Sequence, residues 1–418
     1  MKFPSQEKLE KYADLALKTG VNLQKGQKLM INSPIEGAEF TRVIAQKAYE
    51  MEAEDVHINW TDDALTRMKY EYGGQETLSE VPGWQQQQYT YFAKEGAAIL
   101  SVMANDPDLL KGMDAGKVAA ANKARAEAMS EFRQHIMSDR IQWSIVSIPI
   151  PAWAQKIFPN ESSEKAVDKL WDQIFKIVRV DQEDPVAAWE EHNKTLLKAR
   201  RYLNKKQYSK LVYKAPGTNL EVELPKDHIW KGGRRPLATG NEDIQFNPNI
   251  PTEEVFTAPH KYGVYGKVSS TKPLNYGGNL IENFSLTFEG GKVVDFNAEE
   301  GAETMKHLLE TDEGSQRLGE LALVPHESPI SQSGLIFYNT LFDENASCHL
   351  ALGKAYPNNV SGGSDMSGDA LDQNGINDSL SHVDFMMGSA ELDIDGVLED
   401  GTQEPVMRNG SWAISFNE

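Results

Sequence analysis

Two stretches in the second half of the chain combine groups that can bind a metal ion or carry a proton. The first stretch holds Glu344, His349 and Tyr356 among apolar and small residues, and the second holds His382 and Asp384. A polar group that is buried without a partner destabilises a fold, so such groups need a compensating interaction in these surroundings. These two stretches are therefore the candidates for a functional site.

The residues around His382 alternate in polarity and favour β-structure, which predicts a strand. Side chains two positions apart on a strand share a face, so His382 and Asp384 point together and Val383 points into the core. The same period places His349 on the face opposite Cys348. Two imidazoles and at least two carboxylates can converge on one cavity, and such a nitrogen and oxygen set suits Zn, Mn or Co. Taken alone, a His-x-Asp pair is more often a simple hydrogen-bonded pair.

Two further acids stand beside apolar, strand-like runs that have Pro or Gly close by. One lies in Asn249-Ile-Pro-Thr-Glu-Glu-Val-Phe-Thr-Ala-Pro259, and the other is Glu320 in Arg317-Leu-Gly-Glu-Leu-Ala-Leu-Val-Pro325. The end of a strand can present such a side chain to a cleft. The alternative interpretation is that both are solvated loop acids.

Composition limits the classes of protein that the chain can represent. Its 418 residues are 40% hydrophobic and 25% charged, as in soluble globular proteins, and no apolar run is long enough to span a bilayer. The net charge is −20, and no basic cluster can follow a phosphate backbone, so neither nucleic acid nor membrane is an expected partner. The first residues form no apolar leader, and the one cysteine, Cys348, has no intrachain partner, so we expect a cytoplasmic protein.

The first 200 residues alternate helical and strand patterns. Helices are expected over 5–20, 38–51, 84–95, 113–130, 163–177 and 184–203, and strands near 26–32, 56–60, 97–103 and 142–148. This alternation predicts an α/β domain with a doubly wound, mainly parallel sheet. No Gly-x-Gly-x-x-Gly or Gly-Lys-Ser/Thr follows the first strand, so the sheet is expected to be a scaffold or substrate wall.

After residue 200 the chain becomes a series of short β patterns split by Gly, Pro and Asn. Strands are expected over 220–224, 264–268, 284–288 and 293–296, and a helix over 301–311. Gly290-Gly291 predicts a hairpin. We therefore expect a scaffold domain over 1–200 and an α+β, β-rich catalytic domain over 201–418. The segment 358–369, rich in Gly, Ser and Asp, is expected to be a surface loop or a gate over the site.

Five motifs, in order, resemble those of the metalloaminopeptidases typified by aminopeptidase T, aminopeptidase S and PepS. They are Asn-x-Pro-Thr-x-Glu-Val-Phe-Thr-Ala-Pro, Leu-Gly-Glu-Leu-Ala-Leu-Val-Pro, Leu-Phe-Asp-Glu-Asn-Ala-x-Cys-His, Gly-x-Ala-Tyr and Ser-His-Val-Asp-Phe-Met. The resemblance covers essentially the whole chain, and the specific motifs lie between residues 230 and 386.

The resemblance implies a cytoplasmic, homodimeric enzyme that releases N-terminal amino acids from peptides with a water activated by two divalent ions, Zn, Co or Mn. The implied metal ligands are Glu254, Glu320, His349, His382 and Asp384. The implied neighbours are Glu344, as the proton-transfer group, and Tyr356, as a donor to the developing oxyanion. The family often has Gly where this chain has Glu253, which leaves Glu253 as the alternative ligand to Glu254, although the spacing to the following Val-Phe favours Glu254.

Three other functions remain to be compared with this one. A Cys-His hydrolase would use Cys348, but neighbours on a strand face opposite ways, so Cys348 and His349 cannot pair and Cys348 is expected in the core. A serine hydrolase is disfavoured because the chain has no Gly-x-Ser-x-Gly. A non-catalytic protein that binds metal or peptide is the alternative from a different class.

Overall fold

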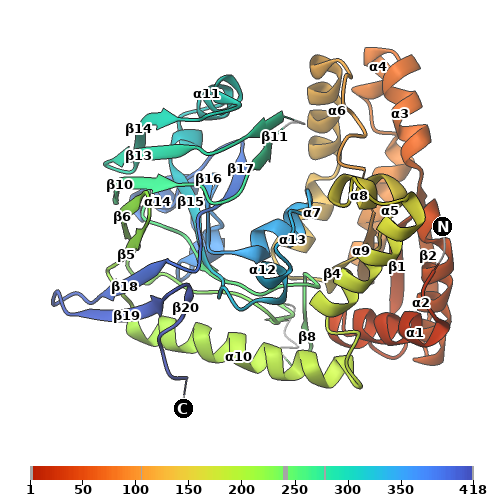
Figure 1. Cartoon of the computed structure of the whole chain (residues 1–418). Coiled ribbons are helices and arrows are strands. Elements are labelled where there is room, and N and C mark those ends of the chain that lie inside the picture. The colour runs from red at the N-terminus through yellow and green to blue at the C-terminus, as the bar shows by residue number, and fades with distance from the viewer. Residues whose placement is uncertain (1–2, 105, 239–242, 277–278, 417–418) are drawn as a thin grey trace. The chain divides into compact units, whose positions relative to one another are not determined.

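The computed structural model describes residues 3–104, 106–238, 243–276 and 279–416. The chain forms two compact units, one comprising residues 1–192 and 234–251 and the other residues 193–233 and 252–418 (Figure 1). The predicted division into a scaffold domain and a catalytic domain at residue 200 stays a prediction. No helix in the described part of the chain is long and apolar enough to cross a membrane.

The first unit is built on a four-stranded parallel sheet. Its strands are β1 (Lys28–Pro34), β2 (Asp55–Thr61), β3 (Ala98–Met103) and β4 (Trp143–Ser147), in the order β2-β1-β3-β4. The strand order reverses direction at β1, as it does in doubly wound sheets. The expected α/β fold of this part of the chain is therefore confirmed.

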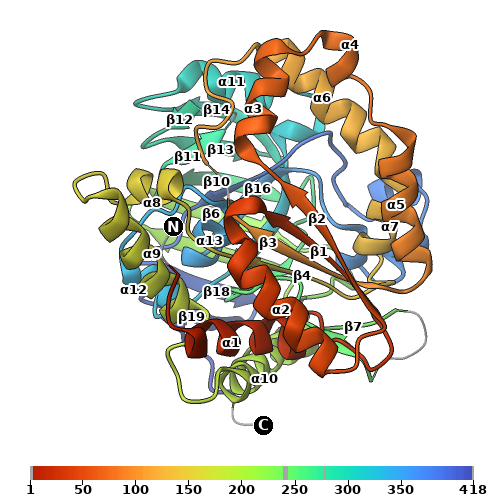
Figure 2. The ribbon, with the colours of Figure 1, turned by 90° about the vertical axis from the view of Figure 1, so that its right-hand side faces the viewer.

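Helices precede, connect and follow these strands, and α1 and α2 face the viewer in Figure 2. Their bounds are α1 Gln6–Leu15, α2 Ala38–Glu50, α3 Asp63–Tyr72, α4 Gln75–Leu78, α5 Gly83–Lys94, α6 Ala115–Ala128, α7 Ser130–Met137, α8 Pro151–Ile157 and α9 Ser163–Ile177. Helix α10 (Pro185–Lys206) begins in the first unit and continues into the second. Ser5 caps α1 by accepting a hydrogen bond from the Lys8 N–H, and a π-helical turn, Ala16–Gly20, ends it where the sequence predicted. Helices α3, α4, α7 and α8 were not predicted, and a short antiparallel pair of strands, β7 (Arg235–Pro236) and β8 (Gln245–Phe246), completes the unit.

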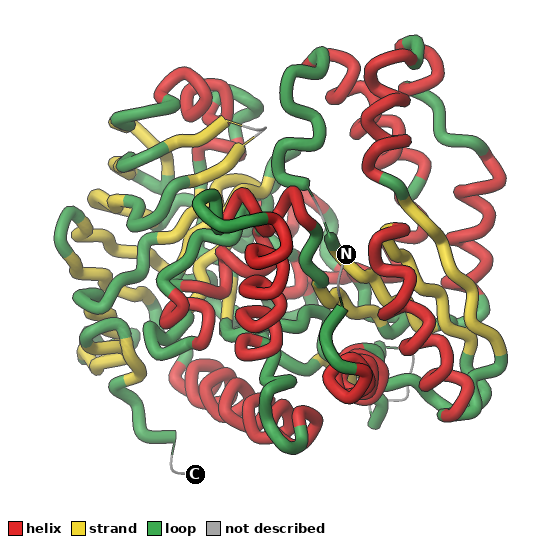
Figure 3. The backbone as a smooth tube through the Cα atoms, turned by 45° about the vertical axis from the view of Figure 1, so that its right-hand side comes forward, coloured by secondary structure: helices red, strands yellow, loops and turns green. Residues whose placement is uncertain are grey.

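The second unit is rich in strands, which Figure 3 draws in yellow. An eight-stranded sheet has the order β14-β13-β10-β6-β5-β18-β19-β20. Its strands are β5 Lys210–Ala215, β6 Thr218–Glu223, β10 Val264–Ser269, β13 Ser285–Glu289, β14 Lys292–Asn297, β18 Asp393–Val397, β19 Gln403–Arg408 and β20 Ser411–Trp412. The predicted hairpin joins β13 to β14, and both of its turn residues, Gly290 and Gly291, have the positive φ that such tight turns require.

A second, four-stranded antiparallel sheet has the order β17-β16-β15-β9. Its strands are β9 Val255–Thr257, β15 Leu318–Leu323, β16 His349–Gly353 and β17 His382–Met386. A small antiparallel pair of strands, β11 (Leu274–Tyr276) and β12 (Asn279–Ile281), and the helices α11 (Ala302–Leu309), α12 (Pro329–Ser333), α13 (Thr340–Asp343) and α14 (Gly368–Gln373) complete the unit. The predicted β-rich character of this part of the chain is confirmed.

One buried apolar cluster connects the two sheets of the second unit. Leu211, Leu220 and Phe288 enter it from the eight-stranded sheet, and Leu321 and Leu350 enter it from the four-stranded sheet. Because side chains alternate along a strand, the core takes every second residue of the four-stranded sheet. The remaining residues of these strands are left to line the opposite face.

The segment 358–369 is partly anchored. Asn359 and Val360 are buried, and the Asn359 side-chain amide donates to the Ile229 carbonyl at 3.0 Å. Short 3-10 turns cover Pro357–Asn359 and Gly363–Asp365, and α14 begins at Gly368. A role of this segment as a gate stays a prediction.

Candidate metal centre

The four-stranded sheet brings the five predicted ligand residues together. Glu320 lies on β15, His349 opens β16, His382 and Asp384 lie on β17, and Glu254 directly precedes β9. Strand alternation explains why all of them face the same way. Their neighbours in sequence, Val255, Leu321, Leu350, Val383 and Phe385, belong to the core cluster or pack against it. The predicted orientation of His382, Asp384 and His349 thus follows from packing on the other face of the sheet.

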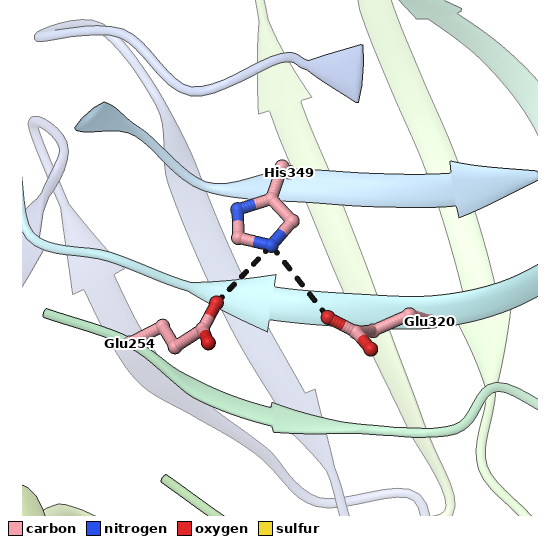
Figure 4. A group of neighbouring side chains, drawn as sticks. All are labelled: Glu254, Glu320 and His349. Carbon is pink, nitrogen blue, oxygen red and sulfur yellow. Dashed lines mark ion pairs between the residues drawn. The ribbon is translucent and has the colours of Figure 1, made fainter. Parts of the chain in front are cut away.

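The first group of facing atoms joins three strands of the sheet. His349 Nε2 lies 3.2 Å from Glu254 Oε2 and 3.6 Å from Glu320 Oε1. All three side chains are nearly inaccessible to solvent. Figure 4 shows both carboxylates directed at the same imidazole nitrogen. These three residues offer oxygen and nitrogen atoms that all lie within 4.8 Å of one another.

The second group uses the other oxygen of the same glutamate. His382 Nε2 lies 3.8 Å from Glu320 Oε2 and 3.4 Å from Asp384 Oδ1. Among the described residues, these three form a further set whose ligand atoms lie within 4.8 Å of one another. Glu320 is therefore common to both groups, with one oxygen directed to each.

The donor set matches what a divalent cation requires. Three atoms at the centre, Glu254 Oε2, His349 Nε2 and Asp384 Oδ1, are buried and lack a well-formed hydrogen bond to any described residue. Buried polar atoms normally have partners, so this cluster of exceptions indicates a site for an ion. Carboxylate oxygen and imidazole nitrogen are the usual ligands of Zn and related metals. The residues present therefore fit a metal centre.

Backbone carbonyls orient both imidazoles. His349 Nδ1 lies 3.1 Å from the Ser347 carbonyl oxygen, and His382 Nδ1 lies 2.7 Å from the Lys354 carbonyl oxygen. A proton on Nδ1 satisfies each carbonyl and leaves Nε2 as the free acceptor that a metal ion needs. The backbone thus selects the tautomer in which both histidines can act as ligands.

Without a cation, the excess of carboxylates alters the protonation of the cluster. Burial raises the pKa of Glu320, and the charges of Asp384 and Glu254 raise it further. Burial disfavours charged imidazoles, but the facing carboxylates outweigh it, so the pKa of His349 is raised well above its usual value and that of His382 to about 10. Burial also opposes the charge of Asp384, yet the His382 imidazole lowers its pKa. A cluster that stabilises added positive charge in this way suits cations.

The two predicted neighbours lie beside the groups. Glu344 starts the 3-10 turn Glu344–Ala346, and burial together with the charges of Glu254 and Asp384 raises its pKa well above the usual range. The Tyr356 ring lies 5.6 Å from the His382 ring and 6.2 Å from the Phe256 ring, between centroids. Its side chain is 39% exposed. Both residues are therefore near the cluster without belonging to either group of three.

Two alternatives from the sequence fit the structure less well. Glu253 is buried outside both groups, and its backbone N–H donates to Asn345 Oδ1 at 2.7 Å. Cys348 lies in the core cluster, where burial raises the pKa of its thiol to about 11 and its Sγ donates to the Val324 carbonyl oxygen. A thiol in that state is not a thiolate nucleophile. The expectation that Cys348 is a core residue is confirmed.

Ala351 completes the site and carries no chemical signal that sequence analysis can detect. In the sheet it pairs with Glu320 on one side and with Asp384 on the other, and it is fully buried. Side chains opposite each other on neighbouring strands have Cβ atoms about 5 Å apart. A methyl group at this position therefore leaves space between the two carboxylates.

Ala351→Val is accordingly expected to reduce metal binding by Glu320, His382 and Asp384, because the added methyl groups enter the space between the two carboxylates. Overpacking costs about 1–3 kcal/mol, so the fold should survive in a protein of ordinary stability. Metal analysis by plasma mass spectrometry after dialysis measures the loss. Leu350→Ile, a volume-conserving change on the core face of the same strand, is the control. Full occupancy in Ala351→Val would show that this space is not used.

Comparison with known proteins assigns the chain to a family. Residues 5–412 match the family described as thermophilic metalloprotease (M29). Aminopeptidase 2 of Geobacillus stearothermophilus is 56% identical over 411 residues, covering 98% of this chain and 99% of the relative. Aminopeptidase T of Thermus thermophilus is 44% identical over 406 residues, covering 97% and 98% of the two chains.

A solved structure agrees with these matches. Wild-type AmpT from Thermus thermophilus superimposes with a TM-score of 0.92 at 42% identity, covering 98% of this chain and 100% of that one. Similarity therefore extends across both compact units and is not confined to the five motifs. The chain belongs to the M29 family of metalloproteases, and the prediction that it is a metalloaminopeptidase is confirmed.

Proposed function

We propose that this enzyme removes N-terminal residues from peptides at a centre that holds two divalent metal ions. The observation that carries this proposal is the position of Glu320, whose two oxygens face two separate sets of ligand atoms. Glu254 and His349 would hold one ion, His382 and Asp384 the other, and Glu320 both. Zn, Co and Mn all accept such ligands, and on affinity alone Zn binds more tightly than Co or Mn.

When bound, the two ions supply a water of lowered pKa and polarise the carbonyl of the peptide bond. The protein supplies the groups that move protons. Glu344, whose carboxylate lies near those of Glu254 and Asp384, would take a proton from the attacking water and return it to the leaving amine. Glu344 belongs to neither ligand group, so its carboxylate remains available for this task.

Tyr356 supplies a second group for the reaction. Its ring contacts the His382 side of the centre, and its hydroxyl is a hydrogen-bond donor at neutral pH. We propose that this hydroxyl donates to the oxygen that becomes negatively charged during attack on the carbonyl. A donor aimed at developing charge stabilises the transition state more than the substrate.

The choice of exopeptidase over endopeptidase rests on ligand chemistry. The neutral form of a free α-amino group has a lone pair that can act as a ligand to an ion held by either ligand group. Acetylation converts the amine to an amide and makes that lone pair unavailable. The site is therefore expected to act on free N-termini, as the names of the relatives also suggest.

An assay of the metal-free enzyme tests the proposal. We expect EDTA followed by dialysis to abolish hydrolysis of Leu-p-nitroanilide, and added Co, Zn or Mn to restore it. N-acetyl-Leu-p-nitroanilide should remain uncleaved by the restored enzyme. Equal rates on the free and acetylated substrates would contradict an exopeptidase, and full activity without metal would contradict the metal centre.

We also propose that the enzyme acts in the cytoplasm as a homodimer. The single cysteine, Cys348, is free and buried, which fits a protein that needs no oxidising compartment. The dimer is supported only by the family resemblance. Light scattering on the purified protein measures its mass directly, and a mass near that of a single 46.6 kDa chain would contradict the dimer.

A further inference from the structure

Asp312 connects two segments that lead into different ligand strands. On its own segment, which leads to Glu320 on β15, its Oδ1 accepts a hydrogen bond from the Ser315 N–H at 2.8 Å. From the segment that leads to β17, the Ser379 hydroxyl donates to Oδ1 at 2.8 Å, and the Leu380 N–H donates to Oδ2 at 2.6 Å. Leu380 is two residues before His382. One carboxylate therefore joins the approaches to β15 and β17.

A second buried side chain supports the same junction. Asn377 is 2% exposed, and its Nδ2 donates to the Gly314 carbonyl at 2.9 Å and to the Gly353 carbonyl at 2.6 Å. Gly314 lies beside Ser315, and Gly353 is the last residue of β16. Hydrogen bonds from side chains thus connect the segments before β15 and β17 to the last residue of β16, all at the same end of these three strands.

The sheet alone does not determine the distance that the second ligand group requires. Glu320 on β15 and the ligands of β17 lie on opposite sides of β16, so no ladder of hydrogen bonds joins their strands directly. The pairing of β15 with β16 is also irregular between Leu318 and Glu320, where the register shifts. A bulge of this kind changes the direction of a side chain. The contacts of Asp312 act across this irregular end of the sheet.

We propose that Asp312 is a positioning residue that holds β15 to β17 and so sets Glu320 against His382 and Asp384 for one of the two metal ions. This inference rests on the proposed two-ion function. Glu320 is common to both groups, but its strand β15 is also held by direct pairing with β9 and β16, whereas His382 and Asp384 both lie on β17. The proposal therefore predicts that loss of Asp312 displaces β17 and weakens the ion of Glu320, His382 and Asp384 much more than the ion of Glu254, Glu320 and His349.

Asp312→Asn is the most specific variant. An amide has one oxygen, so it cannot accept hydrogen bonds from the Ser315 N–H and the Leu380 N–H with separate oxygens, and its NH2 group faces one of these donors. Partners that orient metal ligands are typically worth about 10–100-fold in metal affinity. We expect a loss of about this size for the ion of Glu320, His382 and Asp384 and a much smaller loss for the other ion. Ser379→Ala, which removes only the hydroxyl contacts, should cause a smaller loss of the same ion.

A matched control is available in the same unit. Asp393, at the start of β18, accepts a hydrogen bond from the Asn409 N–H at 2.9 Å but connects no ligand strands. Asp393→Asn makes the same change of charge and should bind both ions as the wild type does. Calorimetric and absorbance titration of each metal-free protein with Co²⁺ separates the two binding steps.

Hydrogen exchange on the metal-free proteins gives a readout that does not depend on metal. Asp312→Asn should exchange faster over residues 380–386 than the wild type and the control, with thermal unfolding still cooperative. The inference would be overturned if Asp312→Asn and Ser379→Ala had the same Co²⁺ affinities and the same exchange as the wild type, or if they lost both ions equally. If the wild type bound no Co²⁺ but Asp312→Asn still exchanged faster, the two-ion function would be refuted and the positioning role would be retained.

Discussion

Glu320→Ala is expected, on the proposed two-ion function, to lose both metal ions and essentially all peptidase activity. Each oxygen of this carboxylate faces a different imidazole, at 3.6 Å from His349 Nε2 and 3.8 Å from His382 Nε2. Removing it deprives both groups of a ligand at once. Glu254→Ala and Asp384→Ala each remove a ligand from one group only, so each should retain more metal than Glu320→Ala does.

Metal content per chain after dialysis, together with kcat on Leu-p-nitroanilide, tests this difference. The fold should survive, because the core-facing neighbours Leu321 and Leu323 are unchanged. Removing Glu320 also relieves its repulsion with Asp384 and Glu254 in the metal-free protein. Circular dichroism of the metal-free proteins provides the control. If Glu320→Ala retained one ion at full occupancy, Glu320 would serve a single group and would not bridge the two.

Glu344→Gln is expected to lower kcat by roughly 10² or more while the metal content and KM stay near the wild-type values. The amide preserves the shape of the side chain but cannot accept the proton from water, and general acid–base catalysis is typically worth this factor or more. The Asn345 side-chain amide lies 3.4 Å from Glu344 Oε1 and can still donate to the glutamine oxygen. The local structure should therefore be retained.

Steady-state kinetics and metal analysis on the same sample separate the two possible roles of Glu344. A fall in kcat with both ions present supports proton transfer. A loss of metal along with activity would make Glu344 a ligand, and the base would have to be sought elsewhere. Asp343→Asn is a poor control here, because Asp343 accepts hydrogen bonds from the Phe337 and Asn339 backbones and is itself structural.

The spacing of polar and apolar residues along the chain was enough to predict which way strand side chains face and where an amphipathic helix begins and ends. The alternation around His382 and His349 correctly gave the faces of β17 and β16, because the core takes every second residue there. Helix α9 was predicted with its observed bounds because its apolar residues recur at helical spacing. Helix α3 was missed although its polar and apolar residues segregate about as strongly as those of α1, and none of its residues is buried.

The remaining features depend on contacts between residues that are distant in the sequence. Ala351 is part of the site only because the register sets it between Glu320 and Asp384. Asp312 meets Ser379 across 67 residues of sequence. Ala351 has no reactive group, Asp312 lies outside the five motifs, and strand register over such distances is not visible in a single sequence. Glu254 and Glu320 were assigned as metal ligands only through the family resemblance, since an acid beside a short strand is equally typical of a solvated loop.

The sheet that carries the ligands is fixed on its other face by the apolar core that it shares with the eight-stranded sheet. The entropy of ordering these side chains is therefore lost during folding rather than when an ion arrives. A metal-free protein should already present the ligands at their final spacing. The ligand positions should then stay nearly the same whichever ion is bound, and ions of different size should fit them unequally well. Exchanging Zn for Co or Mn should therefore change the rate of hydrolysis more than it changes the positions of the ligands.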